Sequence, residues 1–89
     1  MQNITIYTIK NCPYCESALT LLRRKGVKIL TEIDITDDIK LRGEMEEKSQ
    51  GARSLPQIFI GETHVGGFDD LNAMNTSGTL DRILKRGAF

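Results

Sequence analysis

Hydrophobic and polar positions alternate near the start of the chain and again after Gly26, which predicts two β-strands. In the first, residues 3–8, Ile4 and Ile6 share one face, and the β-branched residues strengthen the prediction. The second, residues 27–35, keeps the same period through Val27, Ile29, Ile33 and Ile35. Two further strands are expected at 57–60 and 63–65, and the turn around Gly61 predicts that they form a hairpin.

The segment between the first two strands has a helical pattern instead. A helix is predicted from Pro13 to Lys25, because proline suits the first helical position and Gly26 can end the helix. Arg23, Arg24 and Lys25 fall in its last turn, where cations complement the helix dipole. Its inward face is expected to consist of Cys15, Ala18, Leu19 and Leu22.

A second helix is predicted between the second strand and the hairpin. Thr36 or Asp37 is expected to cap it, and it runs to about residue 49. Ile39 and Met45 are expected to face inward. Gly43 lies within this helix and weakens it by up to ~1 kcal/mol relative to alanine.

The C-terminal part is predicted to be helical as well. Asp69 and Asp70 look like the start of a third helix, and Ser77 can cap a last segment. The residues of that segment expected to face inward are Leu80, Ile83 and Leu84.

The predicted order of elements is β-α-β-α-β-β-α, an α/β class. A strand–helix–strand opening implies a parallel first pair, and the hairpin adds an antiparallel pair. We therefore expect one mixed four-stranded sheet with helices packed on its faces. The 89 residues are enough for one compact domain and too few for two, so residues 1–89 are expected to form a single domain.

Composition narrows the function classes. Twelve basic residues balance twelve acidic ones, which argues against a general nucleic-acid or membrane-surface binder. The sequence has no apolar run of about 20 residues that would cross a membrane and no signal-peptide pattern at its start. A cytoplasmic protein is the default expectation, and cysteines in that compartment are kept reduced.

The two cysteines stand in the motif KNCPYC, residues 10–15, and three interpretations compete for them. A zinc site needs four ligands, but the chain offers two cysteines and one histidine, His64, which is expected to be an exposed hairpin residue. A permanent disulfide across so short a loop would stabilise the fold by about 2 kcal/mol at best. A working redox pair is favoured over both, and no metal site is expected.

Position supports the redox interpretation. Cys12 comes directly after a strand and at the start of the first helix, where unpaired amides and the helix dipole favour a thiolate. Lys10 is the nearest cation that could assist. Cys15 is expected one turn further on and facing the core, which suits a resolving thiol that attacks a mixed disulfide formed at Cys12.

The motif CPYC after a first strand, together with SLPQIFIGETHVGGFDDL at residues 54–71, resembles the glutaredoxins, specifically the small bacterial dithiol kind. The resemblance spans essentially the whole chain. It implies a thioredoxin-like fold, a monomer, glutathione as the reductant and co-substrate, and reduction of protein disulfides and glutathionylated thiols.

The resemblance also implies a set of glutathione-binding residues. Pro56 is expected to follow a cis peptide bond, which exposes the backbone of Leu55 to an extended ligand. The glycine turn that leads into the third helix, with Gly67, Phe68, Asp69 and Asp70, could hold a carboxylate of the ligand on backbone amides. An aspartate there can also pair with the ligand's amine. Tyr14 is similar to the family's tyrosine that packs beside the bound thiol.

The chain departs from the family pattern at three points. Ile9 stands where relatives usually carry a lysine, so Lys10 reaches the site only if the loop after the strand turns it back. Phe68 replaces a cysteine or serine. The cation for the glycyl carboxylate is open between Arg42 and Arg53.

Two alternative functions remain at this point. One is a glutaredoxin-like electron donor that thioredoxin reductase reduces. The other is a carrier in which two chains and two glutathiones hold an iron–sulfur cluster. Pro13, Tyr14 and Cys15 argue against the second, because such carriers more typically have glycine after the first cysteine and lack the second.

Overall fold

The computed structural model describes residues 3–86. Its sheet has the strand order β2-β1-β3-β4, with β1 at Ile4–Thr8, β2 at Leu30–Asp34, β3 at Gln57–Ile60 and β4 at Thr63–Gly66. β1 pairs parallel with β2 and antiparallel with β3, and β3 pairs antiparallel with β4. The predicted mixed four-stranded sheet, with its parallel first pair and its hairpin, is confirmed.

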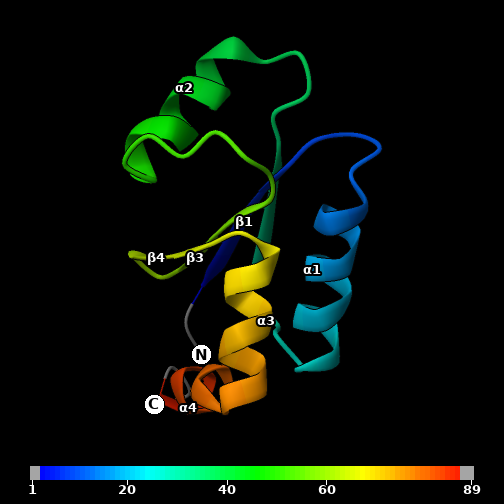
Figure 1. Ribbon diagram of the computed structural model, residues 1–89, viewed down its shortest axis with the longest axis vertical. Coiled ribbons are helices and arrows are strands. Elements are labelled where there is room, and N and C mark those ends of the chain that lie inside the picture. The colour runs from blue at the N-terminus through cyan, green and yellow to red at the C-terminus, as the bar shows by residue number, and fades with distance from the viewer. Residues whose placement is uncertain (1–2, 87–89) are drawn as a thin grey trace.

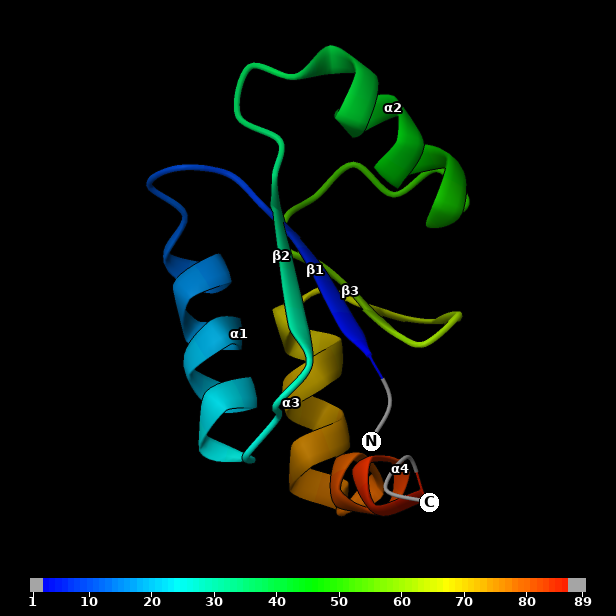
Figure 2. The ribbon, with the colours of Figure 1, turned by 180° about the vertical axis from the view of Figure 1, so that it is seen from behind.

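In the described part of the chain, four helices surround this sheet: α1 at Pro13–Arg24, α2 at Ile39–Lys48, α3 at Phe68–Ser77 and α4 at Thr79–Arg86. α1 and α3 lie side by side on one face, and α2 lies on the other (Figures 1 and 2). α4 follows α3 at the end of the sheet farthest from α2. Within residues 3–86, no helix is long and apolar enough to cross a bilayer.

The two faces of the sheet carry two separate apolar cores. Ile4 and Ile6 of β1 belong to the core under α1 and α3, together with the predicted inward residues of α1 other than Cys15. The alternate residue Tyr7 points to the opposite face and packs with Phe59 and Met45 beneath α2. This opposite direction of neighbouring strand residues follows from the pleat of β1.

The second strand and second helix are shorter than predicted. β2 begins at Leu30, and Ile29 is exposed although its period-two position predicted burial. The cap of α2 is Asp38, whose carboxylate accepts a hydrogen bond from the Leu41 amide at 3.0 Å; the prediction of Thr36 or Asp37 was wrong. Ile39 is also not inward, since 88% of it is exposed. As the first helical residue, it lies beyond the edge of the small core that Met45 anchors.

The C-terminal part of the chain consists of two helices, α3 and α4, and α3 starts one residue earlier than predicted. α3 begins at Phe68 rather than at Asp69, and Gly78 ends it in the left-handed conformation at φ 84°. Ser77 is the last residue of α3, and its hydroxyl accepts a hydrogen bond from the Thr79 amide at 3.4 Å, at the start of α4.

Candidate active site

Cys12 ends the loop between β1 and α1. Asn11 takes a left-handed conformation at φ 58°, which asparagine tolerates better than most residues, and this turns the chain from the strand into the helix. Cys12 is the N-cap residue of α1, and its Sγ accepts a hydrogen bond from the Cys15 amide at 3.2 Å. The first turn of α1 therefore directs the Cys15 amide, which has no acceptor within the helix, at the Cys12 sulfur.

Cys15 lies one turn further on and is buried, with 1% of it exposed. The pKa of the Cys15 thiol is raised to about 12, chiefly by burial and then by the hydrogen bond with Cys12 and nearby negative charge, while a backbone hydrogen bond with Ile9 lowers it. Cys15 is therefore a thiol at neutral pH. Both cysteines are free, with Cys12 half-buried and Cys15 buried, as a nucleophile above a protonated partner requires.

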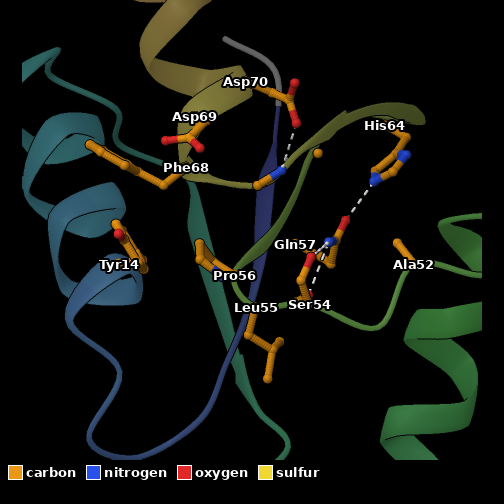
Figure 3. A pocket seen from close by; sticks show the side chains of 12 residues that line it. Tyr14, Ala52, Ser54, Leu55, Pro56, Gln57, His64, Phe68, Asp69 and Asp70 are labelled. Atoms are coloured by element: carbon orange, nitrogen blue, oxygen red, sulfur yellow. Dashed lines mark hydrogen bonds between the residues drawn. The ribbon is translucent and has the colours of Figure 1, made fainter.

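A pocket of about 430 Å³ lies next to the start of α1 (Figure 3). Its walls come from three segments that are distant in the sequence: Tyr14 on α1, the loop before β3, and the turn from β4 into α3. Leu55 and Pro56 line it, and the peptide bond between them is cis, as the family resemblance implies. Outside the regular elements, none of the hydrogen bonds within residues 3–86 uses the backbone N–H or carbonyl of Leu55.

The turn from β4 into α3 forms the opposite wall of this pocket. Gly66 has φ 115°, which an L-residue rarely adopts, and its Cα faces Asp70 so closely that a Cβ would overlap the carboxylate. The Asp70 Oδ2 accepts a hydrogen bond from the Gly67 amide at 3.1 Å and so caps α3. The carboxylate of Asp69, one residue earlier, has no hydrogen bond or ion pair among the described residues and lines the pocket.

Tyr14 links the cysteine helix to the pocket. Its ring stacks on Phe68 with centroids 6.2 Å apart and an interplanar angle of 30°, although 63% of Tyr14 is exposed. The two rings form an apolar surface between the start of α1 and the start of α3 (Figure 3).

Three comparisons with known proteins agree with this arrangement. Residues 4–65 match the family model described as glutaredoxin. The glutaredoxin of Neisseria meningitidis serogroup A is 49% identical over 84 residues, which are 94% of this chain and 98% of that protein. This chain belongs to the glutaredoxin family. Glutaredoxin 3 of Escherichia coli K12 is 46% identical over 85 residues, 96% of this chain and all of that protein.

A solved glutaredoxin shares the fold as well. The solution structure of the glutaredoxin from Brucella melitensis superposes with a TM-score of 0.83 at 49% identity, covering 98% of this chain and 92% of that one. The fold is therefore the thioredoxin-like fold that the family resemblance implied. Family membership also makes the chain a thiol–disulfide oxidoreductase, and the Cys12/Cys15 pair is the group that can carry this chemistry.

The structure brings most of the predicted glutaredoxin site residues together. Seven of them line the one pocket: Tyr14, Leu55, Pro56, Gly67, Phe68, Asp69 and Asp70. Cys12, the N-cap residue of α1, and Cys15, within α1, stand on either side of Tyr14 in the sequence. The roles of these residues toward a ligand stay predictions.

Lys10 does not lie in the pocket wall. Its amide donates a hydrogen bond to the Thr36 hydroxyl at 2.9 Å, which ties this part of the loop to the end of β2. The Asp34 carboxyl has a lowered pKa chiefly because of its hydrogen bonds with Thr36, with the charge of Lys10 as a smaller cause. Lys10 therefore places its charge near Asp34, so its predicted role toward the ligand needs a different side-chain position.

The two candidate arginines are placed differently from each other. Arg53 lies between two pocket-lining residues, Ala52 and Ser54, and pairs with Glu46 at 3.1 Å. Arg42 lies within α2, a half-buried position outside the pocket wall. Of the two, Arg53 is nearer in the chain to the pocket, and its side chain is mostly exposed.

Sequence reasoning missed four residues that line this pocket: Ala52, Ser54, Gln57 and His64. Gly66 also lines it and belongs to the glycine turn that the sequence pointed to. His64 was predicted only as an exposed hairpin residue; it is exposed, and it also faces this pocket (Figure 3). The sequence signal for this side of the pocket is a polar residue, Gln57, directly after the Leu-Pro motif at the start of a buried strand, and it does not point to His64. Within residues 3–86, no group of three or more histidine, cysteine or acidic side chains is arranged to hold a metal ion.

Proposed function

We propose that this glutaredoxin is a glutathione-dependent oxidoreductase that reduces protein disulfides and glutathionylated thiols through Cys12 and Cys15. The observation that carries the proposal is the pocket beside Tyr14. It combines the first turn of α3, the carboxylate of Asp69, and the backbone N–H and carbonyl of Leu55, which make no hydrogen bond within residues 3–86. Glutathione is an extended peptide that carries two carboxylates, an amine and a thiol.

The groups of this pocket complement those of glutathione. The free N–H and carbonyl of Leu55 suit the peptide groups of an extended ligand, which would add to the chain as a short strand. The amides in the first turn of α3 have no acceptor within the helix and suit a carboxylate. Asp69 suits the α-amine, while Asp70 is occupied in capping α3.

In the proposed reaction, the Cys12 thiolate attacks the glutathione sulfur of a glutathionylated protein. A Cys12–glutathione disulfide forms, the original disulfide breaks, and the protein leaves as a thiolate that takes a proton from water. A second glutathione thiolate then attacks the glutathione sulfur. This releases glutathione disulfide and regenerates the Cys12 thiolate, so that one free glutathione is consumed and the substrate's own glutathione forms the other half of the product.

A protein disulfide follows a second route. Cys12 attacks one sulfur and the other sulfur of the substrate leaves as a thiolate. Cys15 then loses its proton and attacks Cys12, which expels the second substrate sulfur and leaves a Cys12–Cys15 disulfide. Two glutathione molecules reduce this disulfide and are themselves joined as glutathione disulfide.

The pH dependence of the Cys15 step is a prediction from its raised pKa. In the mixed disulfide Cys12 carries no charge, but burial still raises the pKa of Cys15, so the thiol remains protonated at neutral pH. Since the thiolate fraction grows with pH until the pKa is reached, the rate constant of Cys15-dependent release is expected to rise about tenfold per pH unit between about pH 6 and pH 8. Single-turnover quenched-flow measurements without added thiol check this. A plateau near neutral pH would contradict it.

The preference among mixed disulfides tests the proposed function. One peptide is prepared as a mixed disulfide with glutathione and as a mixed disulfide with cysteamine, a thiol that lacks the peptide groups and carboxylates. If the pocket binds glutathione through two or more hydrogen bonds, kcat/KM is expected to be at least about tenfold higher for the glutathione form. Equal values for the two forms would show that the pocket does not recognise glutathione.

A further inference from the structure

A chain of hydrogen bonds runs along one side of the pocket, from His64 through Gln57 to Ser54 (Figure 3). The His64 Nε2 lies 2.7 Å from the Gln57 Oε1. The Gln57 Nε2 donates to the Ser54 carbonyl at 2.9 Å and contacts the Ser54 Oγ at 3.2 Å. The His64 ring also stacks on Phe59, with centroids 4.9 Å apart.

The direction of every bond in this chain is fixed by one group. The Ser54 carbonyl can only accept, so the amide nitrogen of Gln57 faces Ser54 and its oxygen faces His64. An amide oxygen is also only an acceptor, so the His64 Nε2 must carry a proton and donate it. The neutral imidazole is therefore the Nε2–H tautomer.

These hydrogen bonds from His64 to Ser54 orient the Leu55 amide through the geometry of the peptide group. The Ser54 carbonyl and the Leu55 N–H belong to one planar trans peptide unit, and they point in opposite directions. A hydrogen bond that fixes the direction of the carbonyl therefore fixes the direction of the N–H. Within residues 3–86 the Leu55 N–H makes no hydrogen bond, and Leu55 lines the pocket wall.

We propose that Gln57 and His64 are positioning residues for the substrate, which aim the Leu55 N–H at a peptide carbonyl of bound glutathione through the Ser54–Leu55 peptide plane. This inference rests on the proposed function. Neither side chain needs to touch the ligand for the effect. His64 holds Gln57, Gln57 holds the Ser54 carbonyl, and the ligand meets an amide whose direction is already set.

The burial of Gln57 indicates that its polar side chain serves a role other than the stability of the fold. Only 2% of Gln57 is exposed, and a buried amide must be fully hydrogen-bonded to avoid a penalty. An apolar side chain of similar shape at such a position is often nearly neutral for stability, because it needs no partners. The polar group is therefore explained better by the peptide plane that it orients than by the fold.

The test compares the wild type with Gln57→Leu on the glutathione and cysteamine mixed disulfides of one peptide. Loss of a neutral hydrogen bond changes an equilibrium about three- to tenfold. The ratio of the two kcat/KM values is therefore expected to fall by roughly that factor, mainly through a higher KM for the glutathione form. An unchanged ratio, with both values equal to or reduced equally from those of the wild type, would overturn the proposal.

His64→Phe is the matched second variant, because it keeps a ring on Phe59 and removes only the donor. It is expected to lower the same ratio, by less than Gln57→Leu does. Thr31→Val removes a side-chain hydrogen bond to Asn3 far from the pocket and serves as the control. If the wild type prefers glutathione and neither variant changes the ratio, this inference fails and the proposed function stands. If the wild type shows no preference, the proposed function fails first.

Nitrogen NMR of His64 gives a readout independent of turnover. In the wild type the neutral ring is expected to be the Nε2–H tautomer, because the Gln57 oxygen requires a donor. In Gln57→Leu this requirement is gone, so the two tautomers are expected to be mixed. A neutral wild-type His64 ring with the proton on Nδ1 would contradict the proposed direction of the hydrogen bond from His64 to Gln57.

Discussion

Replacing Cys12 by serine is expected to lower turnover of both disulfide and glutathionylated substrates by more than about a thousandfold. The hydroxyl that replaces the thiolate ionises far less readily, and neither proposed route has another first nucleophile. Cys15 cannot take over, because it is buried with 1% exposed and protonated at neutral pH. Coupled assays with glutathione, glutathione reductase and NADPH measure this loss.

Cys15→Ser is the matched variant. It is expected to keep at least about half of the turnover of glutathionylated peptides, since a second glutathione resolves that intermediate, and to lose most reduction of protein disulfides. Thermal unfolding of both variants shows whether a loss reflects the fold. Substantial turnover by a folded Cys12→Ser protein, or equal losses in the two variants, would contradict the assignment of roles.

Gly66→Ala is expected to have the second largest effect, on both stability and binding. The φ of 115° is unfavourable for any L-residue, and the new Cβ would overlap the Asp70 carboxylate. Asp70 would have to release the Gly67 amide, which removes the cap of α3. Together these effects are expected to lower the free energy of unfolding by about 2–4 kcal/mol, and to raise the KM for glutathionylated peptide.

Gly43→Ala provides the control for this substitution. Gly43 lies within α2 at a negative φ, and nothing lies within 4 Å of a Cβ built there. The same methyl group is therefore expected to stabilise the protein by up to about 1 kcal/mol without a change in KM. Urea unfolding and peptide kinetics on the pair separate a local effect at Gly66 from a general one. A Gly66→Ala protein as stable as the wild type would show that the turn tolerates a side chain.

The parts of the fold that follow from local pattern were predicted well. The inward face of α1 and the alternation of Ile4 and Ile6 are confirmed, because both elements contribute buried side chains to one core between them. The prediction failed at Ile29 and Ile39, which lie at positions that a simple period would bury. Burial at the end of an element depends on what lies opposite, and there the core has already ended.

The residues of the site also fall into some that could be predicted from local sequence and others that could not. Contiguous motifs such as Leu55–Pro56 and the turn after Gly66 could be recognised from sequence, because each acts through its own backbone. The approach of His64 to Gln57 could not, since it depends on how β4 pairs with β3. A shift of register between Ile58 and Phe59 sets this pairing and places His64 opposite Phe59. The position of Lys10 likewise depends on the loop conformation at Asn11.

The most direct measurement of the central claim is the identity of the adduct trapped on Cys12. The Cys15→Ser protein is mixed with one equivalent of a glutathionylated peptide and no other thiol, and the products are separated by mass spectrometry. If the pocket receives glutathione and directs its sulfur to Cys12, the adduct is expected to be glutathione, with the peptide released as a free thiol. An adduct of Cys12 with the peptide, and free glutathione in solution, would contradict the account.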